Sequence, residues 1–196
     1  MSNPPVSRPW IGENYDGGVR GRKIVICGYS HWDNPEEEKT FRPIDFEAER
    51  TIRTIKTVMD DEICLSFYNQ IKNYFGFKEH RDFWPQVIFF NFIPSSIGSE
   101  KERYKKGSRE QEELGRQRVI EMLNKYSPND LVIFTKKGWN AFPPTLEDAN
   151  EIYPNPWQTY ELSDGTHVRV FPLPHPQFAN KLKMIQDVEK IFSSLP

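Results

Sequence analysis

Four polar side chains stand directly after runs of apolar residues, at positions where they could do chemistry: Ser30, His31, Asn91 and His175. A serine hydroxyl can hold a water molecule through hydrogen bonds, but it is a poor general base near neutral pH. A histidine ring can donate a hydrogen bond or a proton, and an asparagine amide offers both donors and an acceptor. These residue types suit hydrogen bonding to a polar ligand with water beside it.

Each of these residues also has a structural interpretation. Asn91 interrupts a run of bulky apolar residues, so its amide is expected to be buried and to need partners, which a loop or a ligand can supply. Pro174 and Pro176 fix the backbone on both sides of His175, and a rigid turn alone would explain them. His31 can equally be a solvated or structural histidine.

Four short runs rich in β-branched and aromatic residues predict the strands that position these side chains. Three of the runs are almost continuously apolar, as in strands buried on both faces, and this favours a parallel sheet. Because ligands bind beyond the carboxyl ends of such strands, the residues that follow each run are the candidates for a site. The runs are Lys23–Cys27, Val87–Ile93, Leu131–Thr135 and Val168–Leu173.

Helical patterns separate these runs. Apolar residues recur every three or four positions over 48–59 and 64–75, which predicts two amphipathic helices. Ser108 and Gln111 form a capping box, and Ser127-Pro128 is expected to end the following helix near Tyr126. That helix is predicted to face inward with Leu114, Val119, Met122 and Leu123, and the last helix to carry Phe178, Leu182, Ile185, Val188 and Phe192.

This order of elements predicts an α/β protein, a three-layer α/β/α sandwich around a central, mostly parallel four-stranded sheet with right-handed crossovers. Asp164-Gly165 is expected to form a hairpin turn before the last strand. The length of 196 residues predicts a single domain over 1–196, with 1–22 as an N-terminal extension packed on it.

The composition excludes several classes of function. With 26 Lys+Arg against 28 Asp+Glu the net charge is −2, which excludes binding to nucleic acid through bulk basicity alone but not a local basic patch. The two cysteines, Cys27 and Cys64, cannot supply the four thiolates of an iron–sulfur cluster, and the sequence has no CxxC or HExxH pattern. We therefore expect no metal and no cofactor.

The chain also lacks the sequence features of secretion and of membrane insertion. Its first residues, Met-Ser-Asn-Pro-Pro, carry no apolar stretch of a signal peptide, and the longest apolar run, 87–93, is too short to span a bilayer. We expect a cytoplasmic protein with no membrane partner, and a monomer.

A basic segment stands out against this near-neutral background. Between positions 101 and 118 the chain carries seven basic and four acidic side chains, directly after the polar loop 94–99. These side chains suit contacts to phosphates, and the helix that begins near Ser108 would present backbone amides to an anion. A solvated helix with ion pairs is the structural alternative. Acidic loops at Asp33–Glu38 and Glu147–Glu151 offset the charge.

The residues after the predicted strands resemble the motifs of the uracil-DNA glycosylase superfamily, in particular an uncharacterised prokaryotic branch of it. The matching stretches are Gly28–Trp32, Phe90-Asn91 and Pro174–Gln177, joined by Arg8–Tyr15 and Pro128–Trp139. The resemblance covers the chain from about Arg8 to Gln177 and rests on the order, spacing and strand placement of these motifs together.

The resemblance implies a DNA glycosylase, which flips a nucleotide out of DNA into a pocket and cleaves the bond between base and sugar. It implies that His175 donates a hydrogen bond to the departing base, and that Asn91 and Gly28 belong to the base-binding site. Trp32, or else Tyr29, would stack on the base.

The first loop departs from the family pattern, because well-known members carry Asp or Asn at its third position and this chain has Ser30. Ser30 and His31 would position water or phosphate, and a carboxylate from elsewhere could activate the water. Glu13 and Asp33 are the nearest carboxylates in the sequence. Contacts to the DNA backbone are expected from Ser95, Ser96, Lys105, Lys106, Arg109 and Gln177.

Three functions therefore stay open. The first is a DNA glycosylase acting on a deaminated base or on an unusual one, such as a hypermodified base of invading phage DNA. The second is a binding module of the same fold that holds a nucleotide or nucleic acid and has lost hydrolysis. The third is a small-molecule hydrolase or transferase, since a fold does not determine a function.

Overall fold

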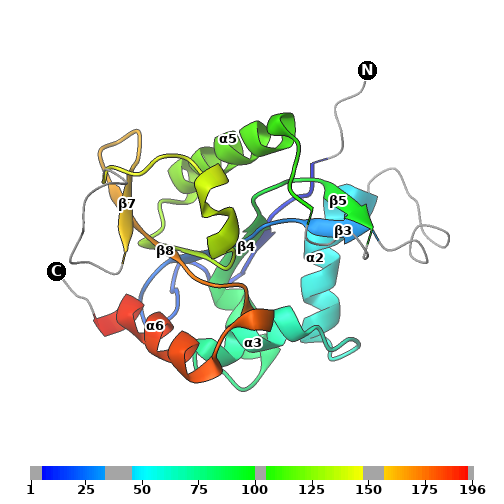
Figure 1. Ribbon diagram of the computed structural model, residues 1–196. Coiled ribbons are helices and arrows are strands. Elements are labelled where there is room, and N and C mark those ends of the chain that lie inside the picture. The colour runs from blue at the N-terminus through cyan, green and yellow to red at the C-terminus, as the bar shows by residue number, and fades with distance from the viewer. Residues whose placement is uncertain (1–5, 34–45, 100–104, 148–156, 194–196) are drawn as a thin grey trace.

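The structure is a computed structural model that describes residues 6–33, 46–99, 105–147 and 157–193. Within these residues the chain forms a three-layer α/β arrangement around a mixed six-stranded sheet (Figure 1). Some parts of the chain fall outside these ranges. They are the first five residues, the acidic residues Glu36–Glu38 and the first charged residues of the basic segment. The sheet order is β1 (Trp10–Ile11), β4 (Val87–Asn91), β2 (Ile24–Gly28), β6 (Asp130–Ile133), β8 (His167–Pro172) and β7 (Gln158–Glu161).

The central strands β4, β2, β6 and β8 are parallel and coincide with the four predicted runs. The prediction of a four-stranded sheet is wrong in extent, because an antiparallel strand is added at each edge. β1 pairs with β4, and β7 pairs with β8 across the predicted Asp164-Gly165 turn, where Gly165 has a φ of 82°. β1 has only two residues, and β7 is half polar. Neither segment has enough of a hydrophobic pattern to be predicted as a strand.

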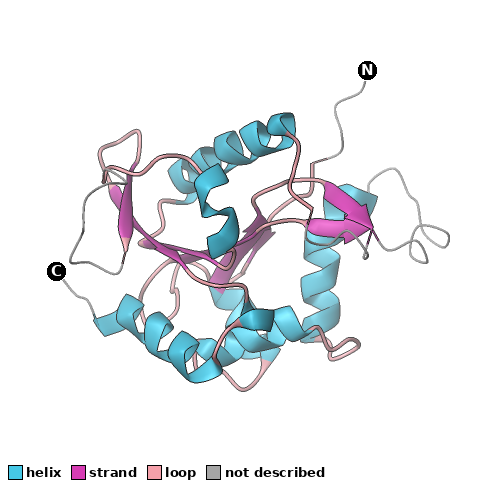
Figure 2. Ribbon diagram, viewed as in Figure 1, coloured by secondary structure: helices cyan, strands magenta, loops and turns pink. Residues whose placement is uncertain are grey.

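Side chains alternate along the parallel strands and build a core on each face of the sheet. Ile24 and Ile26 of β2 pack toward one face, while Val25 and Cys27 pack toward the other. Figure 2 shows the helices on both sides of the sheet. The first face is covered by α2 (Phe46–Met59), α3 (Ser66–Tyr74), α4 (His80–Phe83) and α6 (Lys181–Ser193), and the second by α5 (Arg109–Tyr126).

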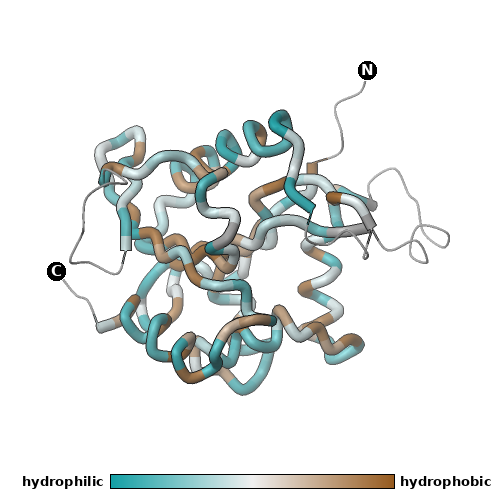
Figure 3. Tube along the Cα trace, in the orientation of Figure 1, coloured by the Kyte–Doolittle hydropathy of each residue, from teal (hydrophilic) through white to brown (hydrophobic). Residues whose placement is uncertain are grey.

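The capping box at the start of α5 is confirmed. The Gln111 backbone N–H donates to Ser108 Oγ at 3.2 Å, and the Ser108 N–H donates to Gln111 Oε1 at 2.8 Å. The helix ends at Tyr126 as predicted, with Ser127 in the left-handed conformation. The prediction that Leu114 faces inward is wrong, because this residue is 42% exposed and does not face the core. The amino end of α5 is hydrophilic (Figure 3).

The last helix begins later than its apolar spacing predicts. Phe178 belongs to a separate 3-10 turn, η4 (Pro176–Phe178), and its side chain is exposed. Leu182 is 73% exposed, whereas Val188 is buried in the core. The Lys183 N–H donates to Asn180 Oδ1, so Asn180 starts α6 after the turn.

Short segments complete the fold between these elements. A second, two-stranded sheet lies beyond the carboxyl ends of β2 and β4, where β3 (His31–Asp33) pairs in parallel with β5 (Ser96–Ser99). This small sheet was not predicted, because both strands are short and polar. Two further 3-10 turns are η1 (Trp84–Gln86) and η3 (Lys136–Ala141).

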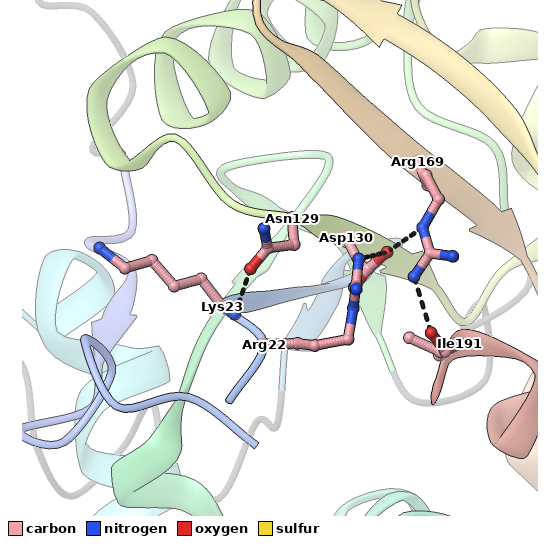
Figure 4. A network of polar contacts seen from close by, with 6 residues as sticks. All are labelled: Arg22, Lys23, Asn129, Asp130, Arg169 and Ile191. Atoms are coloured by element: carbon pink, nitrogen blue, oxygen red, sulfur yellow. Dashed lines mark hydrogen bonds and ion pairs between the residues drawn. The ribbon is translucent and has the colours of Figure 1, made fainter. Parts of the chain in front are cut away.

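A network of ion-paired side chains lies at the amino edge of the sheet (Figure 4). This edge is opposite the strand ends that carry the candidate residues. Asp130 is fully buried and accepts hydrogen bonds from Arg22 Nε at 2.6 Å and from Arg169 Nε at 2.7 Å. Arg169 also donates to the backbone oxygen of Ile191 in α6. The network therefore ties the N-terminal segment, β6, β8 and the last helix together.

Candidate functional site

Gly28 and Asn91 lie side by side at the carboxyl edge of the sheet. They are register partners at the ends of β2 and β4, and Asn91 is 4% exposed. A Cβ placed on Gly28 would come within 2.3 Å of Asn91 Oδ1, so the amide oxygen occupies the space that a side chain at position 28 would need. Glycine is thus required for the Asn91 side chain to lie across the end of β2.

A row of rings leads from this pair to His175. Phe89 lies under Gly28, and the Phe67 ring contacts the Phe89 ring with centroids 6.1 Å apart. The Phe67 ring is also 5.2 Å from the His175 ring. The structure thus brings Gly28, Asn91 and His175 to the face covered by α3, with half-buried Phe67 between them. We call Gly28, Asn91, Phe67 and His175 the strand-end site.

Phe67 is a residue that sequence reasoning missed as part of this site. Its spacing within α3 matches the apolar stripe of a core-facing helix, and that interpretation is correct as far as it goes. No local signal separates Phe67 from Ile71 or Phe75. Only the long-range approach of the loop after β8 shows that this ring borders a histidine.

The backbone around His175 fixes the hydrogen-bonding state of its ring. His175 caps η4, and its Nδ1 accepts a hydrogen bond from the Gln177 backbone N–H at 3.3 Å. Because Nδ1 is an acceptor, the neutral ring carries its proton on Nε2. Burial lowers the pKa of His175, which favours this neutral form. The ring therefore presents one N–H donor away from its own turn.

His31 is directed to α2 and not to this row of residues. Its Nε2 lies 2.9 Å from Thr51 Oγ1, and His31 pairs with Ser96 in the small sheet. Burial, together with the positive charges of Arg50 and Arg118, lowers the pKa of His31 to about 3. His31 is thus a neutral residue that joins β3 to α2, and the half-buried Ser30 precedes it.

Acid should destabilise the protein through His31. The unfolded ring has a pKa near 6.5 and the folded ring near 3, so the unfolded state binds more protons as pH falls below 6.5. We expect a loss of roughly 2 kcal/mol by pH 5 from this group. Urea unfolding at pH 7.5 and 5 measures it, and His31→Gln should flatten the profile. Equal pH dependence in the two proteins would contradict the assignment.

Tyr29 lies on the opposite face of the sheet from Asn91. Its ring stacks on Phe92 with centroids 6.0 Å apart, and its hydroxyl contacts Glu112 Oε1 and the Gly107 N–H. This position does not favour the stacking role expected for Tyr29, because successive residues of an extended chain point to opposite faces of the sheet. Instead, Tyr29 anchors the amino end of α5 at the carboxyl edge. Trp32 lies in β3, and its side chain is outside the described residues.

Of the two carboxylates named from the sequence, Glu13 does not join the strand-end site. Glu13 lies at the amino edge of the sheet, because its neighbours Gly12 and Asn14 donate backbone hydrogen bonds to Val87 and Pro85. It lines a hollow of about 390 Å³ there. The Asp33 backbone is in β3, and its side chain is outside the described residues.

Two other carboxylates, Glu47 and Glu112, stand at the carboxyl edge. Glu47 receives hydrogen bonds from Arg50 and from the Ser96 hydroxyl, while Glu112 contacts the Tyr29 hydroxyl. Neither carboxylate carried a signal in the sequence, since each occupies an ordinary position in the first turn of a helix.

The residues expected to contact DNA phosphates divide into two groups. Ser95 accepts a hydrogen bond from Gln111, and Ser96 bonds to Arg50 and Glu47, so both hydroxyls have protein partners. The other side chains are exposed, at the amino end of α5 or beside His175. They are Lys105, Lys106, Arg109 and Gln177.

Neither models of known protein families nor curated protein sequences match the chain. In the described part of the chain, no group of three or more histidine, cysteine or acidic side chains is arranged to hold a metal ion. The helices found in those same ranges are too short or too polar to cross a membrane.

Proposed function

We propose that the protein is a DNA glycosylase of the uracil-DNA glycosylase type, which flips a damaged or modified base into the strand-end site and hydrolyses its N-glycosidic bond. The observation that carries the proposal is that Asn91 and His175, 84 positions apart in sequence, both lie at the carboxyl edge and are linked there through the rings of Phe89 and Phe67. Such edges are where ligands bind in parallel sheets.

The arrangement suits the charges that develop when an N-glycosidic bond breaks. The sugar becomes positive and the departing base negative, so a donor aimed at a base oxygen stabilises the transition state. The His175 Nε2–H is such a donor, and neutral His175 needs no prior proton uptake. The Asn91 amide would hydrogen-bond the exposed edge of the base, with Phe67 beside its ring.

The exposed ring of Phe178 is a candidate contact to the DNA duplex. It is 65% exposed, and its ring centroid lies 5.9 Å from that of His175. An exposed aromatic ring beside the site can enter the space that a flipped nucleotide leaves, as apolar wedges do between base steps. We assign the role of such a wedge to Phe178.

The second candidate is a binding module that holds a nucleotide without hydrolysing it. It is favoured by one observation, the position of Glu13 at the amino edge of the sheet, which leaves Ser30 in the first loop without that carboxylate. Serine alone is a poor general base. The two candidates predict the same DNA affinity and differ in the release of a free base.

Oligonucleotides that contain uracil, hypoxanthine, xanthine or a modified cytosine separate the two candidates. The protein is incubated with each one, and abasic sites are then cleaved with alkali. Strand scission with at least one base supports the glycosylase. If no oligonucleotide is cleaved but the protein still shifts the same DNA in a gel, the result supports the binding module.

Gly28→Ala tests whether the position of Asn91 matters to base release. The added methyl group would overlap Asn91 Oδ1, so the amide must move. A displacement of about 1 Å can cost about 100-fold in rate, and we expect a loss of about 10- to 100-fold. Gly17→Ala is the control, because its Cβ would meet only an ordinary contact at 3.5 Å. Equal rates for the two variants would argue against a role for Asn91.

A further inference from the structure

A hollow of about 390 Å³ lies beside the His175 turn, between α3 and the segment that leads into α6. One wall is formed by Asn69, Gln70 and Asn73 of α3, and the other by Gln177 and Lys181. We call these five residues the amide groove. Its volume falls within the range of small-ligand pockets, which begins at about 300 Å³.

Hydrogen bonds within α3 fix two of the amides. Gln70 Oε1 accepts from the Tyr74 hydroxyl at 2.7 Å, and Gln70 Nε2 donates to Ser66 Oγ, so this amide has partners on both ends. Asn73 Oδ1 accepts from the buried ammonium of Lys72 at 2.9 Å, which leaves its Nδ2 group as a donor. Gln70 and Asn73 are therefore held in place on this wall.

The opposite wall carries positive charge. Lys181 is exposed and is the first residue of α6, a helix of 13 residues whose amino end presents backbone N–H groups. Gln177 adds an exposed amide. Among the described residues that line the groove there is no carboxylate. A ligand with an anionic group and a polar, hydrogen-bonding edge fits this combination, and a nucleotide has both.

The groove adjoins the strand-end site through one short turn. The Gln177 backbone N–H bonds to His175 Nδ1, and the Tyr74 hydroxyl lies 3.4 Å from the Pro176 oxygen. We propose that the amide groove binds the nucleotide that flanks the flipped one on the same DNA strand. Its phosphate would lie at Lys181 and the amino end of α6, and its base edge at Asn69 and Asn73. This inference rests on the proposed function.

The test measures DNA affinity and not catalysis. Fluorescence anisotropy is recorded with a labelled single-stranded 11-mer that carries one tetrahydrofuran abasic-site analogue. Two further 11-mers replace the nucleotide on its 5′ or its 3′ side by a propyl spacer. We expect wild-type protein to bind one spacer 11-mer about tenfold more weakly than the parent. Asn69→Asp/Lys181→Ala should bind the parent and that spacer 11-mer equally.

Salt dependence supplies a second readout. Lys181→Ala should reduce the slope of log affinity against log salt by about 0.7, the value for one phosphate contact on a single strand. Lys125→Ala removes an exposed lysine at the amino edge of the sheet and should leave the slope unchanged. Thermal melting of each variant shows that it is folded, which is expected because Asn69 and Lys181 make no side-chain hydrogen bond within the described structure.

The inference is overturned if the double variant still discriminates between the nucleotide and the spacer, or if wild-type protein never does. It is also overturned if free deoxyadenosine monophosphate displaces the 11-mer at micromolar concentration, because the groove would then belong to a free nucleotide. If the protein releases a base but the groove variants bind the 11-mers as wild type does, only the proposal for the groove is refuted. If wild-type protein discriminates between the parent and the spacer 11-mer but releases no base, only the glycosylase proposal is refuted.

Discussion

Replacing His175 by alanine is expected to slow base release by about 100- to 1,000-fold. This is the usual cost of removing one preorganised donor from a developing oxyanion. The structure gives the reason, because the His175 ring is neutral, holds its proton on Nε2 and lies against Phe67 at the end of β8. Single-turnover rates with a reactive oligonucleotide measure the effect, since they separate chemistry from binding.

The DNA affinity of His175→Ala should change far less than its rate. His167→Ala is the matched control, because His167 is an exposed histidine at the amino end of the same strand. That variant should release the base at the wild-type rate. A His175→Ala protein that is folded and as fast as wild type would remove His175 from the site.

Asp130→Asn is expected to destabilise the protein by about 3 kcal/mol. Removing one partner of a buried ion pair costs about 3–5 kcal/mol because the remaining charge loses its compensation. We take the lower end, since the side chains of Arg22 and Arg169 stay partly exposed. For a domain of this size, the melting temperature should fall by roughly 6–12 °C.

Glu189→Gln is the control for this substitution. Glu189 pairs with Arg20 on the surface, where both side chains are 47% exposed, and such pairs contribute at most about 1 kcal/mol. Folded Asp130→Asn protein should keep its rate of base release at low temperature, because Asp130 lies at the amino edge of the sheet. Equal melting temperatures for the two variants would mean that the network does not hold the edge together.

The sequence was sufficient for the parallel core of the fold but not for its edges. The four central strands are rich in β-branched and aromatic residues, and three of their runs are almost continuously apolar, which fits a sheet that is covered on both faces. β1 has two residues, and it becomes a strand only because β4 leaves an edge beside it. Tertiary context of this kind is invisible to a local pattern.

The candidate site was predictable where it depends on strand ends. Gly28, Asn91 and His175 lie at the same edge of the sheet because parallel strands end there. Tyr29 follows β2 directly, and its ring packs on the face opposite Gly28, as the alternation of side chains along an extended chain predicts. Glu13 was chosen for its nearness in sequence, but the chain from Gly12 to Asn14 runs along the start of β4.

The most direct test of the account is the release of a free base. The protein is incubated with the oligonucleotides that carry uracil, hypoxanthine, xanthine or a modified cytosine, and mass spectrometry measures free base and abasic DNA together. We predict equal molar amounts of both from at least one substrate, with His175→Ala at least 100-fold slower. DNA binding without free base from any of the four would contradict the central claim.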